Sequence, residues 1–242
     1  MTVLLQARSI SKSFRGLSAV ANACLEVPDG GIVALIGPNG AGKTTCFNMI
    51  AGVFAPDCGE ITFDGRRIEG LRPDQICVAG IGRTFQIVKP FAGLSVQDNV
   101  IVGALNRTAH MDEARKSAVI ILDKLGLGAK RDLPASSLTL PDRKRLEVAR
   151  ALATRPKLLL LDEVMAGLRP TECDQMVEVF RELNATDGLT ILFIEHVMRA
   201  VMALARHIVV LHHGEIIARG TPQEVVRDRA VLECYLGEDT EV

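Results

Sequence analysis

The chain is poor in side chains that stack on nucleic-acid bases, and it has no excess of charge of one sign. Its 242 residues include no Trp and one Tyr, and 28 basic residues are balanced by 29 acidic ones. A general nucleic-acid-binding protein usually carries a basic excess, and single-strand binders rely on aromatic side chains. We therefore expect no nucleic-acid partner.

Paired cysteines and long apolar runs are also missing. The six cysteines form no C-x-x-C pair, which is typical of small buried thiols in a reducing compartment. The stretch MTVLLQARSISKSF lacks the apolar core and the small-residue cleavage site of a secretion signal. No run of about 18 apolar residues occurs, so the sequence predicts no membrane span. If the protein works at a membrane, another chain must anchor it.

Short apolar runs bounded by Gly and Pro alternate with helical patterns along the chain. Strand and helix in alternation predict an α/β fold with a mostly parallel sheet covered by helices on both faces. A mainly helical block from about 94 to 152 interrupts the alternation, and we expect it to be a helical subdomain inserted into the core. We expect strands at 23–27, 32–36, 158–161 and 191–194, hairpins at 61–68 and 208–218, and helices at 43–54, around 173–180 and after 221.

The stretch GPNGAGKTT, residues 37–45, follows an apolar run, opens a helical pattern and matches G-x-x-x-x-G-K-S/T. Its glycines let the backbone curl so that amide groups face inward, and the following helix N-terminus adds positive potential. We expect Lys43 to contact the β- and γ-phosphates of ATP and Thr44 to offer its hydroxyl to Mg²⁺. The predicted nucleotide-binding residues of this loop are Gly37, Pro38, Asn39, Gly40, Ala41, Gly42, Lys43, Thr44 and Thr45.

The stretch KLLLLDE, residues 157–163, places two carboxylates after a predicted buried strand. Ligands of open α/β sheets bind at the carboxyl ends of the strands. We expect Asp162 to hold the hydration shell of Mg²⁺ and Glu163 to polarise a water for attack on the γ-phosphate. An acidic pair after a strand is also a common helix cap, and the phosphate loop is what favours the functional interpretation.

Two further polar residues follow predicted strands. His196 ends LTILFIEH, and a neutral imidazole there can hydrogen-bond a phosphate oxygen and the attacking water. Gln86 ends GRTFQ, just before the helical block, and its amide suits Mg²⁺ or water. A lone His after a strand is often an ordinary surface residue, so its interpretation depends on the acidic strand. We predict catalytic roles for Glu163, His196 and Gln86, and a metal site formed by Thr44, Gln86 and Asp162.

Together these pieces resemble the ATP-binding subunits of ABC transporters, over about residues 3–237. The loop at 37–45 resembles the phosphate loop of that family, Gln86 its glutamine loop, Glu163 its catalytic Glu and His196 its switch histidine. Phe14 stands where the family usually carries an aromatic that stacks on adenine. The resemblance implies one ATP-binding domain over 1–237, with a P-loop NTPase core of RecA-like type, an antiparallel β-subdomain, an inserted helical subdomain at about 88–152 and a C-terminal tail at 238–242.

Three stretches, GRTFQIVKPF, LTLPDRKRLEVARAL and DEVMAGLRP, are similar to the ATPases of branched-chain amino acid importers. This resemblance implies import of such amino acids or a related small solute. It also implies a second ATP-binding subunit in a homo- or heterodimer, transmembrane permease subunits, an external solute-binding protein, and a peripheral location on the cytoplasmic face of the inner membrane.

Two alternatives stay open. One is a soluble, non-transport ABC ATPase that acts on ribosomes or DNA, and the other is a nucleotide-binding regulator without turnover. The single phosphate loop and the absence of sustained heptads weigh against the first alternative. Intact Glu163 and His196 weigh against the second.

The stretch LTLPD, residues 138–142, occupies the position of the signature Leu-Ser-Gly-Gly-Gln of the family, whose helix points at the γ-phosphate bound by the other subunit. Thr139 keeps the hydroxyl of the family's Ser, and we expect it to contact that nucleotide. Leu140 and Pro141 replace the glycines, which let backbone approach phosphate closely. Asp142 replaces Gln, and we expect its carboxylate to repel the phosphate.

The helical block after Gln86 carries more apolar side chains than one exposed segment needs. We expect the part at 88–130 to dock the permease, with Gln86 coupling the two. The alternative is that these apolar residues fill the core of the subdomain. The residues concerned are Ile87, Val88, Phe91, Leu94, Val100, Ile101 and Val102.

Overall fold

The structure is a computed structural model and describes residues 2–86 and 89–236. Its strands are β1 (Val3–Phe14), β2 (Leu17–Pro28), β3 (Ile32–Ile36), β4 (Cys58–Phe63), β5 (Arg66–Arg67), β6 (Ile81–Arg83), β7 (Leu158–Asp162), β8 (Thr190–Ile194), β9 (His207–His212) and β10 (Glu215–Gly220). Its helices are α1 (Lys43–Ile50), α2 (Pro73–Ala79), α3 (Val96–Ala104), α4 (Met111–Lys124), α5 (Leu140–Ala153), α6 (Pro170–Asp187), α7 (Met198–Leu204), α8 (Pro222–Val225) and α9 (Arg229–Leu236), with short 3-10 segments η1 (Gly128–Lys130) and η2 (Ala135–Ser137).

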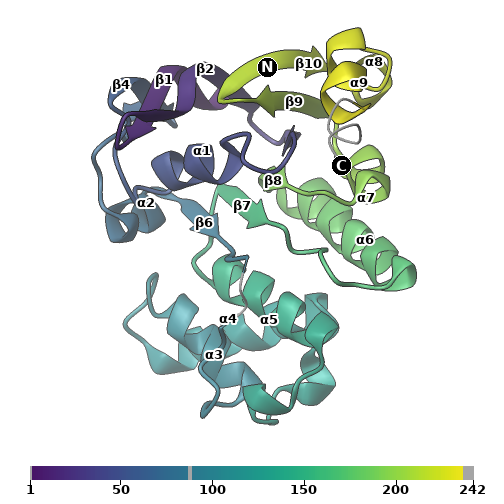
Figure 1. The fold of residues 1–242 in the computed structure, drawn as a ribbon. Coiled ribbons are helices and arrows are strands. Elements are labelled where there is room, and N and C mark those ends of the chain that lie inside the picture. Colours follow the sequence, from purple (N-terminus) through teal and green to yellow (C-terminus); the bar gives the residue numbers. More distant parts are fainter. Residues whose placement is uncertain (1, 87–88, 237–242) are drawn as a thin grey trace.

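Two sheets organise the fold (Figure 1). The central sheet has the order β10-β9-β3-β8-β7-β6, and the second sheet has the order β2-β1-β4-β5. All neighbours in the central sheet run parallel except the β9–β10 hairpin, whereas the pairs of the second sheet are antiparallel. This arrangement confirms the predicted α/β fold with a mostly parallel sheet and an antiparallel β-subdomain.

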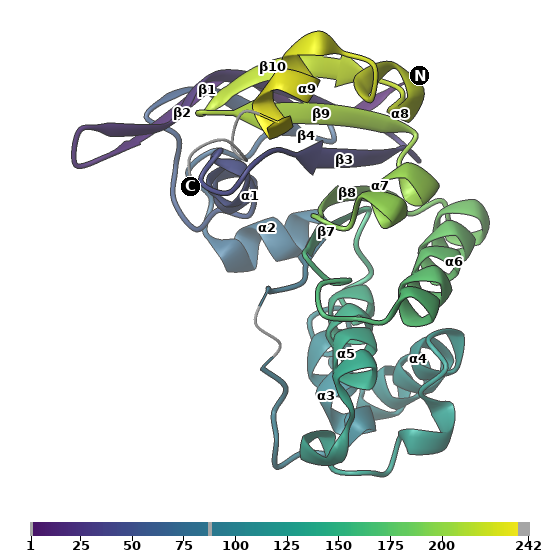
Figure 2. The same ribbon diagram turned by 45° about the vertical axis from the view of Figure 1, so that its right-hand side comes forward.

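The strands of the central sheet are buried on both faces, which explains their continuous apolar runs. Side chains of a strand alternate between the two faces of the sheet. In β3, Val33 and Leu35 belong to the core shared with α1 and the antiparallel sheet, whereas Ala34 and Ile36 belong to the core shared with α6. The sheet is therefore held between α1 and the β-subdomain on one side and α6 and α7 on the other (Figure 2).

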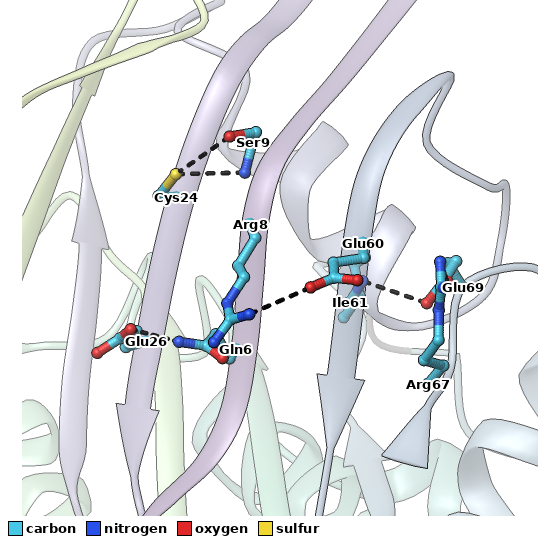
Figure 3. Close-up of polar contacts among 9 residues, drawn as sticks. All are labelled: Gln6, Arg8, Ser9, Cys24, Glu26, Glu60, Ile61, Arg67 and Glu69. Carbon is cyan, nitrogen blue, oxygen red and sulfur yellow. Dashed lines mark hydrogen bonds and ion pairs between the residues drawn. The ribbon is translucent and has the colours of Figure 1, made fainter. Parts of the chain in front are cut away.

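The outer face of the antiparallel sheet is polar. Figure 3 shows Gln6 bonded to Glu26 and Arg8 paired with Glu60 across neighbouring strands. Exposed pairs of this kind contribute little to stability, typically about 0–1 kcal/mol. The apolar residues that alternate with them, such as Ala7 and Ile61, face the core.

Three helices, α3, α4 and α5, lie together on one side of the central sheet, between β6 and β7 in the chain (Figures 1 and 2). They confirm the predicted helical insertion. Val100 and Ile101 are buried among these helices, so for them the interpretation as subdomain core was the better one. Ile87 and Val88, and the predicted tail at 238–242, lie outside the described residues.

The structure differs from the sequence prediction at several places: helices α2 and α7 were not predicted, and the end of α1 and strand β1 also differ. The helix expected at 43–54 ends at Ile50, because Gly52 adopts a left-handed conformation (φ 72°) where a Cβ would collide with the carbonyl of Leu71. Strand β1 was not predicted. Its alternation is interrupted near Ser9, which has φ 49° and lies at a register shift against β2.

Among the helices of residues 2–86 and 89–236, none is long and apolar enough to cross a bilayer.

Candidate active site

The loop at 37–42 joins β3 to α1, and its glycines have conformations that other residues rarely adopt. The φ angles of Gly37, Gly40 and Gly42 are 148°, 78° and 102°. A Cβ at Gly37 would collide with the carbonyl oxygen of Leu211, and one at Gly42 with that of Ala19. The loop therefore needs glycine for close packing as well as for its curl, as expected for a phosphate-binding loop.

The side chain of Lys43 lies against this loop. Its ammonium donates to the carbonyls of Gly37 at 2.6 Å and Pro38 at 2.7 Å, and the residue is buried. Asn39, Gly40 and Thr44 are exposed, Thr45 is half-buried, and Ala41 is buried behind them. The predicted nucleotide-binding residues at 37–45 thus form a loop and the first turn of α1, with an exposed rim and a buried lysine.

Asp162, the last residue of β7, is 3% exposed. Its Oδ2 accepts from Nη2 of Arg83 at 3.0 Å, and Nη1 of Arg83 donates to Asn48 of α1 at 2.7 Å. Burial raises the pKa of the Asp162 carboxyl, although Arg83 acts against that rise. Arg83 thereby links Asp162 to the helix that carries Thr44. Nothing in the sequence around Arg83 points to this role, because its partners come from distant parts of the chain.

The side chains of Gln86 and His196 both contact the carboxylate of Glu163. Nε2 of Gln86 donates to Oε2 of Glu163 at 2.7 Å, and Nε2 of His196 lies 2.7 Å from Oε1. The three residues follow β6, β7 and β8, which are neighbours in the central sheet. Glu163 itself has φ 50°, a left-handed conformation that is costly for a residue with a Cβ.

Two buried ionisable side chains that no motif predicted contact the backbone at Glu163 and Met165. Lys144 of α5 is 5% exposed and donates to the carbonyl oxygen of Glu163 at 2.9 Å. Glu195 is 2% exposed, and its Oε1 accepts from the backbone N–H of Met165 at 2.7 Å. Burial lowers the pKa of Lys144 and raises that of Glu195 to about 7. In the sequence these residues look like ordinary charges of a helix face and a strand end.

Helix α5 begins at Leu140, with Thr139 as its N-cap residue. The hydroxyl of Thr139 donates to Oδ2 of Asp142 at 2.7 Å, and Nζ of Lys130 lies 2.5 Å from the same oxygen. Burial acts to raise the pKa of Asp142, but these two hydrogen bonds and the positive charges of Lys130 and Arg145 together hold the pKa below its ordinary value. The expected repulsion between Asp142 and a phosphate is therefore weaker than the sequence suggested, because the Asp142 carboxylate is paired with Lys130.

Phe14 ends β1, next to the turn of the β1–β2 hairpin, whose end projects from the molecule in Figure 2. Its ring contacts Phe54 edge to face at 5.2 Å, with Nζ of Lys12 5.8 Å from its centroid. The side of β2 at Ala19 borders Gly42. Phe14 is 44% exposed, so part of its ring is open for contact with a base.

The predicted metal ligands fit Mg²⁺ by their chemistry. Thr44, Gln86 and Asp162 offer hydroxyl, amide and carboxylate oxygens, which are the ligands that Mg²⁺ prefers. Gln86 uses its amide nitrogen for Glu163, so its oxygen is the atom suited to a metal. Among the described residues, no group of three or more His, Cys, Asp or Glu side chains is placed to hold a metal ion. Mg²⁺ usually keeps several waters and is bound by one or two carboxylates together with substrate phosphates.

The sequence matches two known protein families. Residues 20–166 match the family described as ABC transporter, and residues 215–241 match the family described as branched-chain amino acid ATP-binding cassette transporter.

Curated relatives cover nearly the whole chain. It is 40% identical over 250 residues to the high-affinity branched-chain amino acid transport ATP-binding protein LivG of Salmonella typhimurium, covering 97% of this chain and 98% of that protein. It is 36% identical over 242 residues to the lipopolysaccharide export system ATP-binding protein LptB of Acidithiobacillus ferridurans, covering 100% of both.

Solved structures with the same fold extend this similarity. The ADP conformation of MJ1267, an ATP-binding cassette of an ABC transporter, superimposes with a TM-score of 0.89 at 30% identity, over 98% of this chain and 100% of that one. The nucleotide-free ATP-binding cassette of an ABC transporter gives a TM-score of 0.88 at 30% identity, over 97% and 99% of the two chains.

Proposed function

This chain belongs to the ATP-binding subunits of ABC transporters, and from that premise we propose that it powers the uptake of branched-chain amino acids, or of a related small solute, through partner permeases. The match of residues 215–241 to the branched-chain family and the likeness to LivG support the solute class. The convergence of Gln86 and His196 on the carboxylate of Glu163 is the observation that carries the proposed mechanism.

The phosphate loop binds the triphosphate in this proposal. Backbone amides of 37–45 and the N-terminus of α1 face the phosphates, and Lys43 shifts from the loop carbonyls toward the β- and γ-phosphate oxygens. Thr44, Asp162 and Gln86 would hold Mg²⁺. The bound ion would neutralise part of the phosphate charge.

Glu163 acts as the general base. It accepts a hydrogen bond from the water that attacks the γ-phosphate, and it polarises that water. Each of its oxygens has one hydrogen-bond partner in the structure, Gln86 or His196, and keeps a further lone pair that can accept from the water, so these two side chains would flank that water. These two residues are therefore placed to sense whether a γ-phosphate is present.

A cleft of about 390 Å³ lies beside Gln86 and suits a segment of the permease. It runs between α2 and β6 on one side and α3 and α5 on the other, and exposed apolar side chains line it. Phe85 and Phe91 are 59% and 45% exposed, and Glu147 in the cleft accepts a hydrogen bond from the backbone of Phe85. An apolar helix of the permease that fills this cleft would press on the segment that ends at Gln86.

The cleft changes which residues we propose for permease docking. Phe91, Leu94 and Val102 are exposed as a docking role requires, whereas Val100 and Ile101 are not. The cleft also includes Val53 and Phe85, which lie before the predicted block.

We test the docking site by cross-linking in membranes that contain the permease, after replacing Cys77 of the cleft by Ser. A cysteine at Phe91 should cross-link to the permease, whereas a cysteine at Ile120, which is more exposed than Phe91 and lies on α4, should not. Permease cross-links that form from Ile120→Cys alone would rule out the cleft.

Solute uptake tests the transport function itself. We expect the chain, assembled with permease and solute-binding protein on the cytoplasmic face of the membrane, to drive ATP-dependent uptake of labelled leucine into cells. Glu163→Gln should abolish this uptake while leaving the complex assembled. A complex that exports a lipid and takes up no amino acid would contradict the proposal, and the likeness to LptB makes this a necessary comparison.

A further inference from the structure

Two buried side chains of opposite charge hold the backbone around Glu163. Lys144 donates to the carbonyl oxygen of Glu163 at 2.9 Å, and Glu195 accepts from the N–H of Met165 at 2.7 Å. The two side chains also attract one another. The segment 163–165 is therefore fixed from α5 on one side and from the end of β8 on the other.

This segment has a conformation that must be held by its surroundings. The φ angle of Glu163 is 50°, a left-handed conformation that is strained for a residue with a Cβ. Such backbone strain persists where neighbouring groups over-determine it. The turn points the carboxylate at Gln86 and His196, so a change in the turn would move the carboxylate away from both.

Filling of the core alone does not explain why ionisable side chains occupy these two buried positions. Taking two charges out of water is costly, and apolar residues of similar size often stabilise a protein at least as well. One oxygen of Glu195, Oε2, is buried and has no hydrogen-bond partner among the described residues. The groups that face Glu195 are Lys144 of α5, Glu163, Cys173 of α6 and the backbone of Met165 and His196.

We propose that Lys144 and Glu195 are positioning residues that clamp the backbone of 163–165, so that α5 controls the placement of the Glu163 carboxylate. The proposal rests on the proposed role of Glu163 as the base. Helix α5 belongs to the helical part of the molecule and also carries Glu147 into the cleft proposed for the permease. A movement of α5 against the central sheet would pull Lys144 away from Glu163 and misplace the base. The clamp would thus connect the docking cleft to the attacking water.

The test measures ATP turnover, KM and ATP affinity of the full chain carrying Lys144→Met. We expect kcat to fall at least about tenfold with KM and ATP affinity changed by less than about twofold, because small misplacements of a catalytic group cost this much or more. Lys144→Arg, which keeps the charge and the donor, should recover most of kcat. Arg145→Met is the control. Arg145 is the next cation along α5, and it contacts Gln175 and not Glu163, so this substitution should leave kcat unchanged.

A second readout follows the backbone directly. Hydrogen exchange of the amides at 163–168 should speed up in Lys144→Met and stay as in wild type in Arg145→Met. If Lys144→Met does not fold, Glu195→Gln replaces it, since it keeps the acceptor for Met165 and loses the attraction for Lys144. It should lower kcat without changing KM.

Several results would overturn the clamp. One is wild-type kcat in a folded Lys144→Met or Glu195→Gln chain while Glu163→Gln is inactive. Another is an equal loss of kcat and ATP affinity, which would mean general damage to the site. Wild-type turnover by Glu163→Gln would instead contradict the proposed role of the base.

Discussion

Two helices of this protein begin at sites proposed to meet phosphate, and they are built in different ways. At the start of α1 the backbone forms the site: glycines at 37, 40 and 42 curl the loop, and Lys43 lies against it. At α5 side chains fill the start of the helix, where Thr139 and Lys130 both bond to Asp142. The first site presents backbone amides to a ligand, whereas the second satisfies its own polar groups.

From this difference we expect the start of α1 and the start of α5 to contribute differently to ATP binding and to dimerisation. The loop before α1 has its curled conformation in the single chain, so we expect it to bind ATP without a partner. The start of α5 must break an internal hydrogen bond before Thr139 can donate to a nucleotide on the other subunit. We therefore expect tight ATP binding by the isolated chain together with weak ATP-induced dimerisation.

The largest effect should follow from Gly37→Ala, which attacks the backbone design of the first site. The new Cβ would collide with the carbonyl of Leu211 and would also need φ 148°, so we expect ATP binding to fall below detection in calorimetry. Gly40→Ala is the matched control, since its Cβ would meet open space and only the conformational strain remains. Equal affinity in the two variants would contradict the packing argument.

A smaller loss is expected from Lys43→Ala. The substitution removes the charge that would contact the phosphates, and charge-assisted hydrogen bonds contribute roughly 1.5–3 kcal/mol, so ATP affinity should drop at least about tenfold. Lys116→Ala, which removes an exposed lysine of α4, serves as the control in the same calorimetric titration. Unchanged ATP affinity in Lys43→Ala would contradict the assignment of this loop as the phosphate-binding site.

The second site is tested by Asp142→Asn in a chain that also carries Glu163→Gln. Loss of the carboxylate leaves Lys130 as an uncompensated cation and weakens the hold on Thr139. We expect ATP-induced dimerisation, followed by sedimentation, to strengthen by about 1 kcal/mol, or roughly fivefold.

Lys130→Ala is the matched opposite of that substitution. It leaves the charge of Asp142 without its cation, and we expect weaker dimerisation. If Asp142→Asn weakens the dimer instead, the carboxylate serves the start of the helix and does not hinder closure.

The smallest effect concerns pH. The pKa of Asp142 is lower in the folded chain than in the unfolded one, so its contribution to stability is present above its ordinary pKa and is lost as pH falls through the folded value. Because Lys130 is partly exposed, we expect the contribution to be less than about 1 kcal/mol. Urea unfolding of wild type and Asp142→Asn between pH 5 and pH 3 should show a difference that shrinks with acidification. A difference that grows would contradict the depressed pKa.

Local patterns predicted the fold well where burial is uniform. The runs in β3, β7 and β8 are apolar without alternation because both faces of the sheet are covered, and each was placed within one residue of its observed bounds. Strand β1 escaped prediction because the shift near Ser9 breaks its alternation. The end of α1 depends on a contact between Gly52 and Leu71 that the helix pattern does not contain.

In the candidate site too, residues of short local motifs were predicted and residues paired over long distances were not. The phosphate loop and the residues after three strands were predicted, since each depends on a short stretch of sequence. The charge partners were not: Arg83 and Asp162 are 79 residues apart, and Lys130 and Asp142 are 12 apart with a turn between them. Pairs of this kind exist only once the chain is folded, so the charge on Asp142 looked unpaired in the sequence.

The most direct test of the account is ATP turnover by Glu163→Gln. The substitution keeps the shape of the side chain and removes the charge that polarises water. We predict ATP affinity close to that of wild type, with turnover lower by about a hundredfold or more, the usual range for a general base. Hydrolysis at the wild-type rate would contradict the assignment of Glu163 as the base and, with it, the mechanism built on the three residues that meet there.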